Sequence, residues 1–257
     1  VVIRIDTSGR EKPVPVAIEG LTLSGGVGLD GPSLLVAGGA DVRVAGCAIS
    51  ANGSGIQVWD HSRVTIADSA IADSVTDGIV LLGSSEVVLT HCTFSGNRWS
   101  GIAIWNSARA TIAGCTFSDN TTGIKAVGTS AERPARLTVV ACTFFENVFG
   151  MWVRGWTGAV VTGCNLFGNI SGIGLRESAA ITLTGNRIRS NEQYGIVVYA
   201  HPCYDVGDVF TGLVAGRANS IPGWSEPDGN RFGAACPSDL HFLMTEEGGE
   251  YDRRESP

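Results

Sequence analysis

The sequence has little of what marks a membrane span, a helical protein or a nucleic-acid-binding surface. Its longest apolar runs are only a few residues, which is too short for a transmembrane helix. Blocks of the helix-favouring residues Ala, Glu, Lys and Leu are missing, and this argues for an all-β class. Lys and Arg number 18 against 25 Asp and Glu, so the formal net charge of −7 argues against a nucleic-acid footprint.

What the sequence does contain is a repeat. The string HCTFSGN, which spans residues 91 to 97, returns in later copies as GCTFSDN, ACTFFEN and GCNLFGN. Weaker copies surround Cys47, Ser69 and Asn186, and the intervals between successive copies are 22 to 27 residues. Self-similarity at a nearly fixed period indicates a stack of equivalent units. The run is continuous from Ala40 to Tyr199, which favours one domain over two.

Each copy contains three short runs in which inward and outward positions alternate, and Gly, Asn and Ser separate the runs. Runs this short cannot be helices, and they predict a three-sided coil whose strands pair in parallel with their copies. Apolar residues recur at four inward positions, as in the series Ile49, Ile71, Phe94, Phe117, Phe144, Leu166 and Ile188. Five residues after each Cys position an Asn recurs from Asn52 to Asn191, with Ser74 as the exception, which predicts a hydrogen-bonded corner.

These ladders resemble those of the right-handed parallel β-helix, or pectin-lyase-like, superfamily over roughly residues 14 to 235. The resemblance implies an all-β, single-stranded right-handed parallel β-helix of about nine three-sided coils. Members include pectate lyases, polygalacturonases, uronan epimerases and tailspike endoglycosidases, so it also implies acidic or neutral polysaccharides as ligands. It does not specify a reaction, because one fold carries many functions.

We expect one β-helix domain over residues 1–257. Its expected parts are an N-terminal cap and first coil at 1–39, regular coils at 40–199, a decorated last coil and C-terminal cap at 200–245, and a polar tail at 246–257. The chain begins at Val1 without a charged leader region, which fits a mature protein or a trimmed one.

Five of the seven cysteines occupy one ladder position, namely Cys47, Cys92, Cys115, Cys142 and Cys164. We interpret them as a stack of buried thiols that behave as small hydrophobic residues. No Cys-x-x-Cys spacing occurs, so we expect no metal site there. Cys203 and Cys236 lie outside the ladder and are candidates for one disulfide, although the sequence leaves the reduced state open. A disulfide, together with the family resemblance, would favour an extracellular, cell-surface or periplasmic location.

The outward positions of the strand after the glycine turn carry aromatic and basic side chains. The strip consists of Trp59, Trp105, Lys125, Trp152, Arg154, Arg176 and Tyr199. Sugar rings stack on aromatic planes and Arg forks hold carboxylates, so we predict that this strip binds polysaccharide. The alternative is that the strip is covered, either by the insertion at Gly128 to Pro134, by a terminal segment, or by a protein partner or second copy of the chain.

Catalytic motifs are missing from the sequence. The Asn-Thr-Asp and Gly-His-Gly strings of polygalacturonases and the Asp-Pro-His-Asp string of uronan epimerases do not occur. Asp60, His61 and His201 border the aromatic strip and are the acid or base candidates by location, with a plain turn role as the alternative. The corner carboxylates Asp73, Asp77 and Asp119 offer a calcium site or are solvated turn residues; otherwise we expect no cofactor.

We therefore predict an exported protein that binds polysaccharide without a recognisable catalytic apparatus. Two alternatives stay open: a polysaccharide lyase or glycoside hydrolase whose site is not visible in linear motifs, and a surface scaffold that docks a protein partner.

Overall fold

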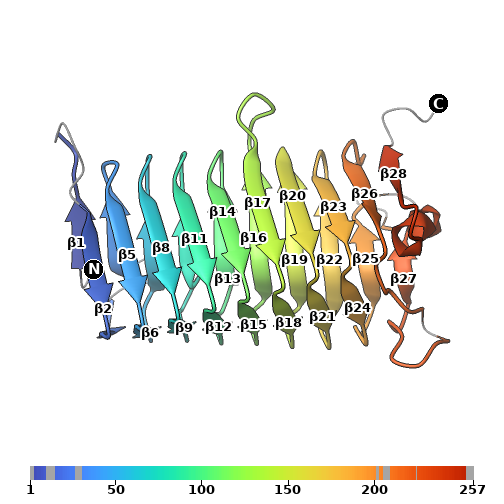
Figure 1. Ribbon diagram of the computed structural model, residues 1–257, viewed down its shortest axis with the longest axis horizontal. Coiled ribbons are helices and arrows are strands. Elements are labelled where there is room, and N and C mark those ends of the chain that lie inside the picture. Colours follow the sequence, from blue (N-terminus) through green and yellow to red (C-terminus); the bar gives the residue numbers. More distant parts are fainter. Residues whose placement is uncertain are drawn as a thin grey trace.

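The computed structural model describes residues 3–9, 15–26, 31–200, 203–204, 209–223 and 225–252. The chain winds into a right-handed parallel β-helix with three sheets, which confirms the predicted fold class (Figure 1). Two sheets have ten strands and the third has eight, so eight turns contribute to all three sheets. About nine coils were expected; where a ninth strand of the third sheet would follow, Arg187 and Ser220 form only an isolated bridge.

Sheet A contains β1 (Ile3–Asp6), β4 (Pro32–Ala37), β7 (Ser54–Val58), β10 (Ile79–Leu81), β13 (Ser100–Trp105), β16 (Thr122–Gly128), β19 (Phe149–Gly155), β22 (Ser171–Arg176), β25 (Tyr194–Val198) and β27 (Gly233–Cys236). Sheet B contains β2 (Val16–Glu19), β5 (Asp41–Ala45), β8 (Arg63–Ala67), β11 (Glu86–Thr90), β14 (Arg109–Ala113), β17 (Ala135–Val140), β20 (Thr157–Thr162), β23 (Ala180–Thr184), β26 (Leu213–Arg217) and β28 (Gly249–Asp252). Sheet C contains β3 (Thr22–Ser24), β6 (Ala48–Ser50), β9 (Ala70–Ala72), β12 (Thr93–Ser95), β15 (Thr116–Ser118), β18 (Thr143–Phe145), β21 (Asn165–Phe167) and β24 (Arg187–Arg189).

The bore of the solenoid is filled by the four predicted apolar ladders. Each member lies beside its equivalent on the next coil, and all of these side chains are buried. Phe94, Phe117 and Phe144 stack face to face with 4.8 Å between successive ring centroids. The inside is therefore a packed core and not a channel.

Two polar columns lock the coils in register. In the predicted Asn column, Asn97 Nδ2 donates to Asn120 Oδ1 at 3.0 Å, and the pattern continues to Asn230. In the predicted Cys column, the backbone N of Cys92 donates to Cys115 Sγ at 3.4 Å, and the next coils repeat this contact. Buried backbone amides at the corners therefore have partners on the following coil, as their burial requires.

The two ends of the stack differ from its middle. The seven-residue 3₁₀ helix η1 (Ser238–Met244) buries Leu240 and Leu243 against the last coil, where a C-terminal cap was expected. The expected tail is partly ordered, because β28 pairs antiparallel with β26; residues 253–257 lie outside the described part. The enlarged loop at residues 129–134 projects from one edge of the stack, as predicted (Figure 1).

In the described part of the chain, no helix has the length and apolar character needed to cross a bilayer.

Candidate functional site

The outer face of sheet A carries a groove of about 890 Å³ that extends across β4, β7, β10, β13 and β16. We call it the aromatic groove. Its lining consists of Pro32, Leu35, Gln57, Trp59, Thr76, Asp77, Val80, Leu82, Trp99, Ser100, Trp105, Thr121, Thr122 and Lys125. Three of the predicted strip residues, Trp59, Trp105 and Lys125, therefore come together here.

The strand register explains the shape of the aromatic groove. Trp59 and Leu82 directly follow β7 and β10, and Trp105 is the last residue of β13. The Cα atoms of these strands are paired in register, so the three side chains form one wall. Trp99 lies just before β13 and forms the opposite wall. Val80 and other smaller outward residues form the floor between the walls. Trp59 is 40% exposed and Trp99 is 56% exposed, so both rings have free surface in this chain.

The described lining of the groove includes one carboxyl group and one amine. The Asp77 side chain is only 7% exposed, and its Oδ1 accepts a hydrogen bond from the backbone N of Ser100 at 2.9 Å. Burial raises the pKa of the Asp77 carboxyl, while hydrogen bonding from Ser100 and the charge of Lys125 oppose that rise. Lys125 Nζ lies 4.8 Å from the centroid of the Trp105 ring, a cation–π contact. The two charged groups thus lie on an otherwise largely apolar surface.

The C-terminal half of the same face is closed by its own side chains. The rings of Phe149, Trp152, Tyr199 and Tyr204 form what we call the aromatic cluster; Trp152 lies 4.7 Å from Tyr199, and Tyr204 stacks on Tyr199 at 4.4 Å. Trp152 lies across Gly174 of the next coil. A Cβ added to Gly174 would be 2.5 Å from Cε3 of Trp152. The rings that were predicted to bind sugar here pack against one another.

A disulfide anchors this closed half. Cys203 and Cys236 are bonded, with Cα atoms 5.7 Å apart, which confirms the pairing that the sequence left open. The bond joins the segment that carries Tyr204 to β27, beside β25. The hydroxyl of Tyr204 also donates to Gln193 Oε1 at 3.3 Å. Burial, and next the charge of Tyr204, raise the pKa of the Tyr199 phenol, as expected for a ring held in a filled site.

The two predicted carboxylate-binding arginines lie beyond the aromatic groove. Arg154 and Arg176 are neighbours on β19 and β22. The guanidinium of Arg154 donates to Glu177 Oε1 from Nε at 2.8 Å and from Nη2 at 2.7 Å. The fork that was expected to hold a sugar carboxylate is therefore engaged by a carboxylate of this chain.

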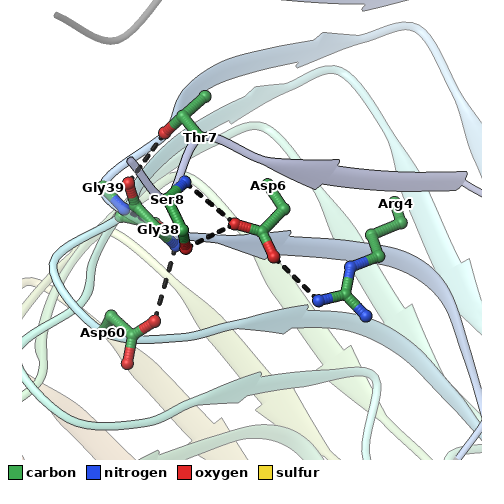
Figure 2. A network of polar contacts seen from close by, with 8 residues as sticks. Arg4, Asp6, Thr7, Ser8, Gly38, Gly39 and Asp60 are labelled. Carbon is green, nitrogen blue, oxygen red and sulfur yellow. Dashed lines mark hydrogen bonds and ion pairs between the residues drawn. The ribbon is translucent and has the colours of Figure 1, made fainter. Parts of the chain in front are cut away.

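The acid or base candidates lie at a corner of the solenoid. Asp60 is exposed in a left-handed conformation with φ of 62°, and its carboxylate accepts a hydrogen bond from the backbone N of Gly38 at 3.4 Å. Figure 2 shows this contact beside a second one, in which Asp6 accepts hydrogen bonds from Arg4 and Ser8. The bonds from Arg4 and Ser8 hold the pKa of Asp6 below its usual range. Asp60 thus ties its corner turn to the preceding coil.

The remaining candidates are dispersed. His61 is exposed beside Asp60, and His201 lies outside the described residues. Asp73 and Asp119 are exposed corner residues, each with φ of 54°, and the coil between them has Gly96 at the equivalent position; Asp77 lines the aromatic groove instead. Across the described ranges, no three His, Cys, Asp or Glu residues gather closely enough to hold a metal ion.

Sequence reasoning missed Trp99 and the place of Asp77 in the groove. Both precede a strand of sheet A, in the turn where the alternation of inward and outward residues does not apply. The available signal was their short distance from the Asn column: Asp77 follows Ser74 by three residues, and Trp99 follows Asn97 by two. That spacing places both side chains at the same edge of the sheet.

Comparisons with known proteins agree with this architecture. A family model described as "Right handed beta helix region" matches residues 3–144 and 131–203. The crystal structure of pectate lyase Pel9A is similar with a TM-score of 0.52 and 13% sequence identity, over 93% of this chain and 65% of that chain. This chain thus spans less than two thirds of that protein, and at this identity the likeness concerns the fold alone. A search of curated proteins gave no match.

Proposed function

The chain belongs to the right-handed β-helix family, and we propose that it binds a polysaccharide in the aromatic groove. The observation that carries the proposal is the placement of three tryptophans on two facing walls of one groove, with Trp59 and Trp99 substantially exposed. Aromatic faces offer large apolar surfaces at little conformational cost, and the faces of sugar rings stack on them. The similar fold of a pectate lyase gives the polysaccharide class additional weight.

The register suggests how a polymer would lie. Trp59 and Trp105 are two coils apart, which is about 10 Å at the usual spacing of paired strands. Two linked pyranose rings have a similar length. A sugar chain that runs along the solenoid axis would therefore meet one ring of this wall every second residue, with Trp99 on its other side.

Binding without cleavage is the proposal that fits the groove best. Glycoside hydrolysis ordinarily uses two carboxyl groups about 5 to 10 Å apart. The described lining of the aromatic groove includes one, Asp77, which has little exposure. We also propose that the protein acts outside the cytoplasm, because disulfides such as Cys203–Cys236 persist in oxidising compartments.

Size-exclusion chromatography with a panel of neutral and uronic polysaccharides, with and without calcium, tests this function. The expected result is intact polymer that carries the protein with it. Trp59→Ala and Trp105→Ala should abolish the co-migration, whereas Trp156→Ala should not, because Trp156 is 45% exposed but lies outside the groove.

Two outcomes would contradict the proposal. Shortened polymer would establish an enzyme and make Asp77→Asn and Lys125→Met the next variants. Independent migration of protein and every polymer would shift the case to a scaffold that docks a protein partner.

A further inference from the structure

The charge of the aromatic groove is balanced. Its described lining holds one acidic side chain, Asp77, and one basic side chain, Lys125. They are close enough for the charge of Lys125 to lower the pKa of Asp77 against the effect of burial. The ammonium also lies over the Trp105 ring. An incoming anion would therefore meet a cation that already lies near a carboxyl group and over an aromatic face.

The other described cations on or beside this face lie outside the groove. Arg154 is bonded to Glu177, and the described lining of the groove does not include Arg154 or Arg176. Arg98 precedes Trp99 but lines a separate corner trench, which it shares with acidic side chains such as Asp119. The whole chain carries a formal charge of −7, so its long-range field repels polyanions.

We propose that the aromatic groove selects neutral glycans and discriminates against uronic acid polymers. This inference rests on the proposed binding function. A polyuronate places a carboxylate on every sugar, so a segment lying along the groove would bring several anions against a single compensated cation and the carboxylate of Asp77. Like-charge juxtaposition and the loss of hydration of unpaired carboxylates both weaken binding. A neutral chain offers the same ring faces to Trp59, Trp99 and Trp105 without this cost.

The test uses polymers that differ only in charge. Polygalacturonate, polymannuronate and polyglucuronate are each compared with their carboxyl-reduced neutral forms by affinity electrophoresis and titration calorimetry on the wild-type protein. For the backbone that fits, the neutral form should bind with a dissociation constant at least about tenfold lower than that of its uronic partner. Affinity for the neutral form should change little with salt, because no ion pair forms.

A variant examines the cause. Val80→Arg adds a guanidinium to the floor of the groove. It should narrow the difference in dissociation constant between a uronic polymer and its carboxyl-reduced form. Val80→Met, which adds a side chain of similar length without charge, should leave that difference unchanged. Equal or tighter binding of a uronic form, with or without calcium, would overturn the charge inference and leave the binding function standing. Absence of binding to all six polymers would overturn both the charge inference and the binding function. The failure of the charge inference alone is therefore distinguishable from the failure of the binding function.

Discussion

The two halves of the outer face of sheet A share one strand pattern and form different surfaces. In the open half, from β4 to β16, Trp59 and Trp105 are separated by Leu82, and the described side chains line a groove of about 890 Å³. In the closed half, from β19 to β25, Trp152 faces Gly174 and lies across it to contact Tyr199. An aromatic residue on a solenoid therefore lines a groove or fills it depending on the size of its neighbour on the next coil.

Truncating one tryptophan in each half should separate stability from binding. Trp152→Ala removes the central ring of the aromatic cluster and should lower the free energy of unfolding by about 3 kcal/mol. Trp105→Ala should lower the free energy of unfolding by about 1 kcal/mol, because the main contact removed is the one with Lys125. The same variant should abolish glycan binding. Urea denaturation and affinity electrophoresis measure the two effects. Equal losses of stability would show that the halves do not differ as described.

A single methyl group should disturb the closed half. Gly174→Ala places a Cβ 2.5 Å from Trp152 Cε3 and 3.3 Å from Phe149 Cδ1, so the packed rings must shift. We expect a loss of about 2 kcal/mol in the free energy of unfolding and a change in the near-ultraviolet circular dichroism of the tryptophans. Gly158→Ala on sheet B is the control, because its Cβ would meet no atom within 4 Å. An unchanged Gly174→Ala protein would contradict the close packing of Trp152.

In the open half, the buried carboxyl group of Asp77 should make the free energy of unfolding depend on pH. Because burial raises the pKa of Asp77 above 3.8, the folded protein holds this proton more tightly than the unfolded chain does. The contribution of the protonated Asp77 carboxyl to the free energy of unfolding is fully present below about pH 3.8. It is lost as the pH rises through the folded-state pKa of Asp77. Relative to Asp77→Asn, the wild type should therefore lose stability with rising pH, by at most about 1.4 kcal/mol per pH unit.

Urea denaturation of both proteins at a series of pH values measures this difference. The other carboxyl groups contribute equally to both proteins and cancel. Parallel curves would indicate that Asp77 is not perturbed in the folded state.

The sequence predicted the fold in detail because every coil of the solenoid repeats the same pattern of inward, outward and turn residues. Each inward ladder position is sampled on every coil, so a substitution such as Ser74 in the Asn column does not hide the pattern. The stack of buried thiols followed from the same logic, and η1 lies within residues 200–245, where the C-terminal cap was expected. The ends were harder: β28 pairs antiparallel, and nothing in the period indicates a strand that reverses direction.

The candidate site was predicted only in part. Alternation along the strands showed that Trp59, Trp105 and Lys125 point outward, and these three line the groove. Alternation gives the direction of a side chain but not its rotamer, so the closure of Trp152 over Gly174 could not be foreseen. Trp99 lies in a turn outside the strand pattern. Tyr204 reaches the face from beyond the regular coils, held by a disulfide that the sequence left open.

The Asn column has a mechanical consequence. Its amide contacts run along the axis and join residues 22, 23 or 27 positions apart as far as Asn191, and 39 positions apart from Asn191 to Asn230, so each coil is clamped only to the coils beside it. A force that pulls the two ends apart would load these clamps in series and release the chain one coil at a time. Extension would then proceed in steps of 22 to 27 residues over the regular coils.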